Sequence, residues 1–280
     1  MAEPTILLEG RGIDKFFGKG RQRRQVLFGV DITVYAGECL AVIGGSGSGK
    51  TTLTRVLLGL EDADAGDIRY RGEVLRKQTV KSLRSQSGLV FQNPFDSLDP
   101  RWRVAKSVME PLRLRHHDWS PEQISAHVDD AFLRVSLDPT VYRNRFPMDL
   151  SGGQAQRAAI ARAIVDHPTV LLADEPMSAI DVAARVQILE SFKAIRAAEP
   201  EMALIMVSHD LGVVKHIADR IMVVHDGHVV EIGTAAQVLE RPKNDYTKRR
   251  QPTVSYSRFS DVPALGRPFQ FRRHARHEPP

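Results

Sequence analysis

A run of small residues from Gly44 to Thr51 has the pattern of a loop that holds phosphate. It reads Gly-Gly-Ser-Gly-Ser-Gly-Lys-Thr and fits G-x-x-x-x-G-K-[ST] at every position. The glycines let the backbone form a concave nest of N–H donors, and a helix after the loop adds its positive N-terminal end. Lys50 is expected to reach the β- and γ-phosphates of a nucleotide, and Thr51 to ligate Mg²⁺. A flexible Gly/Ser loop is the alternative, but the buried strand before it and the helix after it favour phosphate binding.

Two adjacent carboxylates, Asp174 and Glu175, end the apolar run 170–173. If this run is a strand that ends beside the phosphate loop, Asp174 would hold Mg²⁺ through its water shell. Glu175 would then polarise an attacking water molecule. Taken alone, such a pair is as often the first turn of a helix, and the phosphate loop upstream is what favours the catalytic interpretation.

The composition is that of an ordinary globular protein, with 280 residues, of which 42% are hydrophobic and 26% charged. Collagen-like, disordered and disulfide-scaffold classes are thereby excluded. The single cysteine, Cys39, cannot form an internal disulfide, so we expect a core residue in a protein of a reducing compartment. No apolar run approaches the ~18–20 residues of a membrane span, and the first residues lack a secretion signal. We expect a soluble protein, or one held at a membrane by a partner.

Positive charge gathers near the C-terminal end of the sequence. The chain has 39 Lys and Arg residues against 34 Asp and Glu, a net charge of +5. Eight of the basic residues and two of the acidic ones lie in 248–280, together with several prolines, so the remainder is close to neutral. We expect 248–280 to be an irregular basic tail that lies against an anionic membrane face.

The order of the expected elements is that of an α/β protein with an inserted helical segment. Hydrophobic patterning predicts strands at 5–9, 26–35, 40–43, 170–173, 203–207, 220–224 and 228–232, and helices at 50–58, around 188–195 and around 234–240. The basic loop 18–24 is more simply a solvated hairpin tip than a nucleic-acid patch, because no aromatic residues alternate with its arginines. From about 102 to 167 we expect helices broken at Pro111, Pro121, Pro139 and Pro147. His116 and His117 have no ligand-spaced partner, which favours a solvated turn over a metal site.

Between the phosphate loop and the two acids stands Leu150-Ser151-Gly152-Gly153-Gln154. With this motif, residues 5–247 resemble the ATP-binding subunit of an ATP-binding-cassette (ABC) transporter. Several motifs occur in the order typical of the family: the phosphate loop, Gln92, the Leu150–Gln154 signature, the Asp174-Glu175 strand end, the Ser178–Asp181 segment and His209. The resemblance implies a phosphate-loop NTPase with a parallel-sheet RecA-like core, an antiparallel β subdomain and an inserted helical subdomain. It implies an ABC ATPase domain over 1–247, with its core at 1–92 and 168–247 and the helical subdomain at about 93–167.

The resemblance also implies ATP and Mg²⁺ as ligands and a head-to-tail dimer of two cassettes, with ATP held between the phosphate loop of one and the signature of the other. Glu175, His209, Gln92 and Lys50 are the implied catalytic residues, and Thr51, Gln92 and Asp174 the implied metal-binding ones. His209 would hold the γ-phosphate and fix Glu175. The residues implied to contact ATP are Phe17, Gly44, Gly45, Ser46, Gly47, Ser48, Gly49, Lys50, Thr51, Thr52, Ser151, Gly152, Gly153, Gln154 and Asp181. In the family, an aromatic residue near the end of the first strand usually stacks on adenine. We favour Phe17 for this role, with Phe16 as the alternative.

A finer resemblance concerns the transported cargo. Residues 90–101, Val-Phe-Gln-Asn-Pro-Phe-Asp-Ser-Leu-Asp-Pro-Arg, are similar to the extended loop of ATPases that serve dipeptide, oligopeptide and nickel importers. Residues 241–247 echo the family's His-Pro-Tyr-Thr ending but have Asn-Asp before Tyr246. The implied partners are a separate permease, a second cassette (a sister subunit or a second copy of this chain) and, indirectly, a substrate-binding protein, at the cytoplasmic face of the inner membrane. A nucleic-acid-associated ABC ATPase is the alternative, although we expect no nucleic-acid partner.

Overall fold

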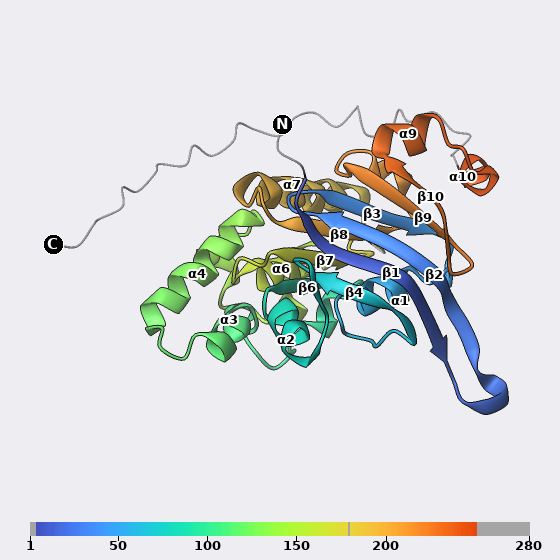
Figure 1. The fold of residues 1–280 in the computed structure, drawn as a ribbon. Helices are drawn as coiled ribbons and strands as arrows, with labels where there is room; N and C mark the ends of the chain where they lie inside the picture. Colours follow the sequence, from blue (N-terminus) through green and yellow to red (C-terminus); the bar gives the residue numbers. More distant parts are fainter. Residues whose placement is uncertain (1–3, 179, 251–280) are drawn as a thin grey trace.

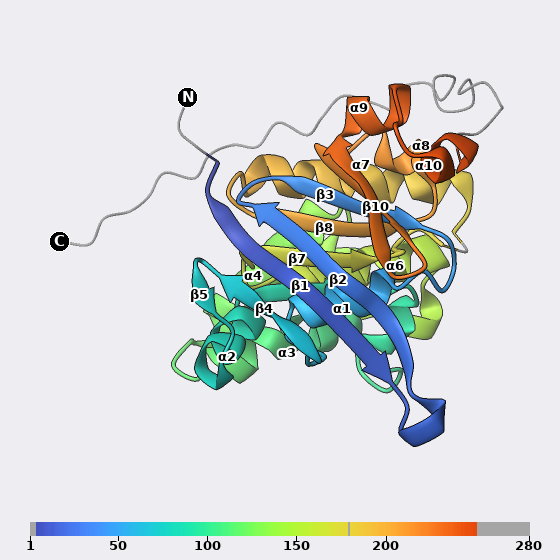
Figure 2. The same cartoon turned by 45° about the vertical axis from the view of Figure 1, so that its right-hand side comes forward.

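The computed structural model describes residues 4–178 and 180–250, which form two β-sheets and a group of helices (Figure 1). The smaller sheet is antiparallel, with strand order β2-β1-β4-β5. Its strands are β1 (Ile6–Phe17), β2 (Arg24–Tyr35), β4 (Ala65–Tyr70) and β5 (Glu73–Val74). A short 3-10 helix, Gly20–Gln22, forms the tip of the β1–β2 hairpin. The hairpin extends beyond the rest of the molecule in both Figure 1 and Figure 2, as expected for a solvated tip.

The larger sheet has six strands in the order β10-β9-β3-β8-β7-β6. They are β3 (Cys39–Gly44), β6 (Ser87–Val90), β7 (Val170–Asp174), β8 (Ala203–Ser208), β9 (Arg220–His225) and β10 (His228–Thr234). All neighbours pair in parallel except β9 and β10, which form an antiparallel hairpin around Asp226-Gly227. Every residue of β3 and β8 is buried, as expected for parallel strands covered on both faces.

Helix α1 (Lys50–Leu57) packs in the core shared by the two sheets. Its buried residues Leu53, Val56 and Leu57 join Leu8 of β1 and Leu27 of β2 in one hydrophobic cluster. This core ties the loop that precedes α1 to both sheets. Helix α2 (Lys77–Ser85) follows β5 and contributes Leu83 to the same cluster.

A helical segment lies between β6 and β7 in the chain. It contains the 3-10 turns Pro94–Asp96 and Pro147–Asp149 and the helices α3 (Val104–Arg115), α4 (Pro121–Arg134), α5 (Pro139–Tyr142) and α6 (Gly152–Ile164). Pro121, Pro139 and Pro147 begin their helices, where the missing N–H costs nothing. Pro111 instead lies inside α3, so the predicted helix break at this proline is wrong. Burial of Val108 and Leu112 on either side of it keeps the helix continuous.

The C-terminal part adds α7 (Val182–Ala198), α8 (Leu211–Val214), α9 (Ala235–Glu240) and α10 (Asp245–Arg250). The predicted irregular tail therefore starts too early, because Lys248–Arg250 form the last turn of α10; residues 251–280 lie outside the described residues.

Cys39 is fully buried, as predicted, and burial raises the pKa of its thiol to about 12. No helix among the described residues is both long and apolar enough to cross a membrane. The predicted α/β architecture, with a parallel-sheet core, an antiparallel second sheet and inserted helices, is confirmed.

Candidate active site

The loop 44–49 connects the end of β3 to the first residue of α1, the order that the phosphate-loop pattern predicts. Gly47 and Gly49 have φ of +73° and +99°, a region that residues with a side chain rarely adopt. A Cβ atom on Gly44 would lie 2.1 Å from the carbonyl oxygen of Val224 on β9. The glycines are therefore required by backbone geometry and by close packing against the sheet.

Lys50 is only 6% exposed and turns back over the loop. Its Nζ donates to the carbonyl oxygens of Gly45 at 2.7 Å and Gly44 at 3.2 Å. Burial lowers the pKa of Lys50 and is the largest influence on it, with the Glu175 carboxylate acting in the opposite direction. A cation fixed in a loop of backbone donors is suited to bind an anion.

Asp174 ends β7 two strands away from β3, and its Oδ1 accepts a hydrogen bond from Thr51 Oγ1 at 3.2 Å. Burial raises the pKa of Asp174, while this hydrogen bond and the positive charges of Arg55 and Lys50 lower it in part. Two of the three residues predicted to bind Mg²⁺, Thr51 and Asp174, are thus hydrogen-bonded to each other although 123 positions separate them in the sequence.

Glu175 follows with a strained backbone, since its φ is +45° and it is not a glycine. Its N–H donates to Val207 O at 3.0 Å, which fixes it to the end of β8. Its Oε2 lies 3.5 Å from Gln92 Nε2 and 3.4 Å from His209 Nδ1. Strain at a residue held by surrounding contacts is a frequent property of catalytic positions. Two predicted catalytic side chains, Gln92 and His209, therefore converge on one carboxylate oxygen of a third, Glu175.

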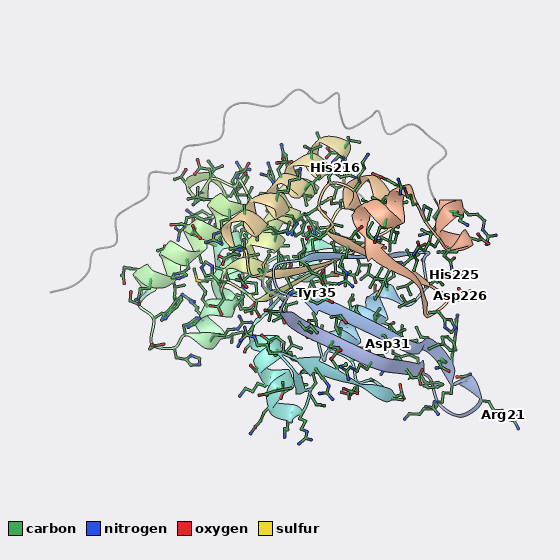
Figure 3. The ribbon with its side chains drawn as sticks, turned by 45° about the horizontal axis from the view of Figure 1, so that its top comes forward. Arg21, Asp31, Tyr35, His216, His225 and Asp226 are labelled. Atoms are coloured by element: carbon green, nitrogen blue, oxygen red, sulfur yellow. The ribbon has the colours of Figure 1, made fainter. Side chains whose placement is uncertain are left out.

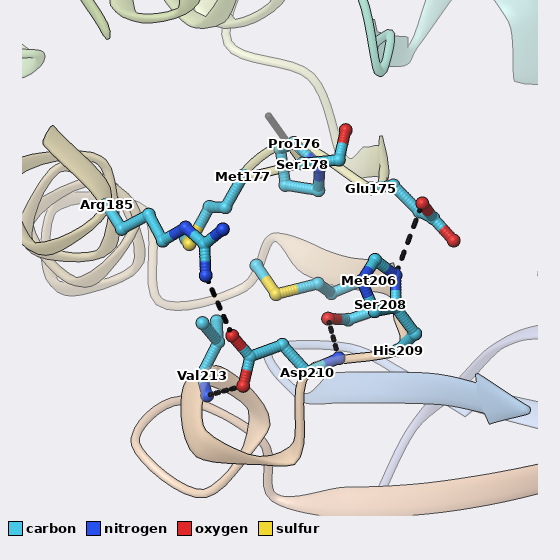
Figure 4. Close-up of a pocket in the computed structure, with 10 residues that line it drawn as sticks. All are labelled: Glu175, Pro176, Met177, Ser178, Arg185, Met206, Ser208, His209, Asp210 and Val213. Carbon is cyan, nitrogen blue, oxygen red and sulfur yellow. Dashed lines mark hydrogen bonds and ion pairs between the residues drawn. The ribbon is translucent and has the colours of Figure 1, made fainter. Parts of the chain in front are cut away.

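A pocket extends from this carboxylate toward α7 (Figure 4). Glu175 and His209 lie at one end of it, and the ion pair between Arg185 Nη1 and Asp210 Oδ2, at 3.3 Å, lies at the other. Asp210 also accepts from the backbone N–H groups of Gly212 and Val213, which caps α8. The loop that carries His209 is therefore anchored on both sides.

The donor set fits a nucleotide with Mg²⁺. Ser48 Oγ, within the loop, is buried and has no hydrogen-bond partner among the described residues. Since buried polar groups are normally hydrogen-bonded, this hydroxyl group is free to bond a ligand. No group of three or more His, Cys, Asp or Glu among the described residues could hold a metal by itself. Mg²⁺ in nucleotide sites needs only one or two protein ligands because substrate phosphates supply others. Thr51 and Asp174 meet that requirement. Ser46 and Gly47 are exposed, and Thr52 is partly buried on α1.

The signature residues do not join this cluster: no described hydrogen bond or ion pair links them to the phosphate loop. Ser151 caps α6 instead, accepting from Gln154 N at 3.3 Å while its own N–H donates to Gln154 Oε1 at 3.0 Å. Gly152 and Ser151 are exposed. A Cβ on Gly153 would lie 2.6 Å from Ala184 Cβ, so close packing on α7 requires a glycine here.

Asp181 and the two phenylalanines lie apart from the carboxylates as well. Asp181 caps α7, its Oδ1 accepting from Ala184 N at 2.9 Å. Phe17, at the end of β1, is 42% exposed, with Lys15 Nζ 5.2 Å from its ring centroid. The ring of Phe16 is covered by the Arg23 guanidinium at 4.0 Å. The exposed face of Phe17 is the more open of the two for stacking.

The sequence did not assign Tyr246 to the site. Its hydroxyl accepts a hydrogen bond from Gly45 N at 3.0 Å, so α10 contacts the phosphate loop. The echo of a known C-terminal motif around Tyr246 was a signal, but nothing local in the sequence indicates a contact with a residue 201 positions away.

Three comparisons with known proteins agree with this geometry. A family model described as "ABC transporter" matches residues 27–178. The chain is 39% identical over 242 residues to the oligopeptide transport ATP-binding protein OppF of Haemophilus influenzae, covering 85% of this chain and 72% of that protein. It is 40% identical over 227 residues to the dipeptide transport ATP-binding protein DppF of Escherichia coli, covering 80% and 67%. The dimeric, post-hydrolysis cassette MJ0796 bound to ADP and Pi superposes with a TM-score of 0.73 at 26% identity, covering 82% of this chain and 99% of that one.

Proposed function

The chain belongs to the ABC transporter family of ATPases, and we propose that it powers the import of peptides through a separate membrane permease. The observation that carries the catalytic part is the convergence of Gln92 and His209 on Glu175 Oε2, beside the Thr51–Asp174 pair. This arrangement joins a candidate base, a phosphate-sensing histidine and a Mg²⁺ site at the carboxyl ends of neighbouring strands.

Each side chain has a role that its surroundings support. Lys50 and the loop N–H groups bind the β- and γ-phosphates of ATP, and Phe17 stacks on adenine. Glu175 accepts the proton of the attacking water, held in place by Val207 O and by His209. Thr51 and Asp174, assisted by Gln92, would hold Mg²⁺, which when bound would neutralise charge on the phosphates. Such fixed donors aimed at developing charge supply much of the catalysis of phosphoryl transfer.

A second cassette completes the site in this proposal. Ser151, Gly152, Gly153 and Gln154 would meet ATP bound to the partner, because in this chain they have no described contact with the phosphate loop. The N-terminus of α6, where Ser151 and Gly152 are exposed and the first N–H groups have no acceptor within the helix, is suited to an anion. Asp181 adjoins it, since Gly153 packs on Ala184 of the helix that Asp181 caps. The partner cassette is a sister subunit or a second copy of this chain.

The segment that follows Gln92 would transmit the ATP cycle to the permease. We assign the catalytic core to 1–92 and 168–247 and the helical subdomain to about 93–167. Gln156 Nε2, on α6, donates to the carbonyl oxygen of Phe91 at 3.1 Å, next to Gln92. This contact connects the signature helix with the residue that precedes Gln92, whose side chain touches Glu175. The complex would lie at the cytoplasmic face of the inner membrane.

Peptides are favoured over nickel as cargo because the relatives compared above carry oligopeptide and dipeptide names. The cargo would reach the permease through a substrate-binding protein, so selectivity depends on chains other than this one. Nickel is the alternative cargo, because residues 90–101 are also similar to the loop of nickel-importer ATPases.

The test is purification of the intact complex from membranes under mild detergent, followed by identification of its subunits. Recovery of a permease and a second cassette with this chain is expected. In reconstituted vesicles, peptide-loaded binding protein should stimulate ATP hydrolysis, whereas nickel should not. Recovery of nucleic acid without a permease would contradict the transport proposal, and stimulation by nickel alone would contradict the assigned cargo.

A further inference from the structure

The last helix of the described chain touches the phosphate loop through one hydroxyl group. Tyr246 Oη, on α10, accepts a hydrogen bond from the backbone N–H of Gly45 at 3.0 Å. A Cβ placed on Gly45 would lie 3.3 Å from that oxygen and 3.8 Å from Arg250 Nη2. The second residue of the loop therefore fits closely under two side chains of α10.

Gly45 also holds the lysine of the loop. Its carbonyl oxygen accepts from Lys50 Nζ at 2.7 Å, the shorter of the two hydrogen bonds that fix this ammonium group. One glycine thus receives Tyr246 at its N–H and Lys50 at its carbonyl. Since glycine has the most backbone freedom of any residue, its orientation depends on these contacts.

Tyr246 is itself held on several sides. Its ring stacks on His225 at the end of β9, with centroids 3.8 Å apart and planes 14° from parallel. Figure 3 shows His225 and Asp226 at the end of the β9–β10 hairpin. The Arg250 guanidinium lies 5.4 Å from the centroid of the Tyr246 ring. The backbone N–H of Tyr246 donates to Asn244 Oδ1 at 2.8 Å. Glu231 on β10 in turn accepts hydrogen bonds from the backbone N–H groups of Lys243 and Asn244.

Resting on the ATPase function proposed above, we propose that Tyr246 is a positioning residue for ATP: its hydroxyl orients the Gly44–Gly45 peptide, whose carbonyl oxygen accepts a hydrogen bond from Lys50 Nζ. The positive charge of Arg250 also acts on Lys50, lowering its pKa, which agrees with α10 lying close to this ammonium group. A Lys50 fixed before ATP arrives loses less conformational freedom on binding, and preorganisation of this kind increases affinity.

The test removes only the hydroxyl. Tyr246→Phe keeps the ring and its stacking on His225 but leaves Gly45 N–H without its acceptor. We expect Mg²⁺-ATP and Mg²⁺-ADP to bind about fivefold more weakly, the effect of one lost hydrogen bond, as measured by titration calorimetry. Hydrogen exchange at the Gly45 amide should become faster in the same variant.

Tyr70→Phe is the matched control. Tyr70 is buried, and its hydroxyl donates to Gln86 Oε1 at 2.7 Å, in contacts that do not involve the phosphate loop. It should lower the melting temperature without changing nucleotide affinity. Equal losses of affinity in both variants, or unchanged affinity in Tyr246→Phe, would overturn the positioning role. A wild-type chain that binds no ATP would instead contradict the proposed function, so the two failures are distinguishable.

Discussion

Thr51 donates a hydrogen bond to Asp174 over 3.2 Å, although 123 positions separate the two residues in the chain. Thr51 is the second residue of the helix after β3, and Asp174 ends β7, two strands along the same sheet. Because parallel strands end at one edge, their carboxyl ends bring side chains from distant motifs together there. The contact joins the phosphate loop to the acidic strand end before any ligand is considered.

Asp174→Asn should weaken the dependence of hydrolysis on Mg²⁺. The amide keeps the shape of the side chain but lacks the negative charge that attracts the cation. We expect the Mg²⁺ concentration for half-maximal ATPase rate to rise about 10–100-fold, the range found when groups that support a metal are removed. Asp226→Asn, at the exposed β9–β10 turn, is the control. An unchanged Mg²⁺ dependence in Asp174→Asn would remove this residue from the metal site.

The pH dependence of stability should identify the buried carboxyl group of Asp174. Burial raises its folded-state pKa above the ordinary value, so folding favours its protonated form. Its stabilising contribution is then fully present below the unfolded pKa, about 4, and is lost as pH rises through the folded value. In Mg²⁺-free denaturant unfolding from pH 4 upward, wild type should lose stability relative to Asp174→Asn. A constant difference between the two proteins would refute the shift.

The phosphate loop and its neighbours could be predicted because their signals are local. Eight consecutive residues specify the loop, and the apolar run before Asp174 specifies a buried strand. The contact of His209 with Glu175 followed from resemblance to a family, since no local pattern relates the two positions. The contact of Gln92 with Glu175 was not predicted. The structure gives both contacts their distances.

The features that the sequence did not predict depend on contacts between distant residues. His116 was expected in a solvated turn, yet its Nε2 lies 2.6 Å from Asp166 Oδ1 and its ring stacks on Trp119. Pro111 was expected to end a helix that tertiary packing keeps intact. Strands β4 and β6 and helix α2 were missed because their apolar residues are too few to show a clear period.

Arg220→Met should destabilise the fold without affecting the site directly. Arg220 Nη1 lies 3.1 Å and 3.2 Å from the two carboxylate oxygens of Glu38, which is only 8% exposed. Burial raises the pKa of Glu38, and Arg220 acts against that shift. Removing the arginine leaves a buried charge without its partner, at a cost of about 3–5 kcal/mol. Urea unfolding should show this loss at pH 7 and a smaller one near pH 5, where Glu38 is more easily protonated.

The double variant Glu38→Gln with Arg220→Met tests the cause of that loss. It removes both charges while the amide can still accept from Tyr35 N, the 2.7 Å bond that Glu38 now makes. We expect most of the lost unfolding free energy to return. A double variant as unstable as Arg220→Met alone would show that the packing of the arginine stem, and not the unpaired carboxylate, determines stability here.

Glu175→Gln should separate ATP binding from ATP hydrolysis. The amide fits the same space and can keep polar contacts with His209 and Gln92, but it cannot accept a proton from water at neutral pH. Because Lys50, Thr51 and Asp174 are unchanged, the affinity for Mg²⁺-ATP should stay within about twofold of wild type, while turnover falls at least about 10²-fold, as for loss of a general base. Glu190→Gln, an exposed carboxylate on α7 that pairs with Lys193, is the matched control and should hydrolyse ATP at the wild-type rate. Retained turnover in Glu175→Gln would mean that another group takes the proton, and the convergence of Gln92 and His209 on Glu175 would then serve only to hold the strained end of β7.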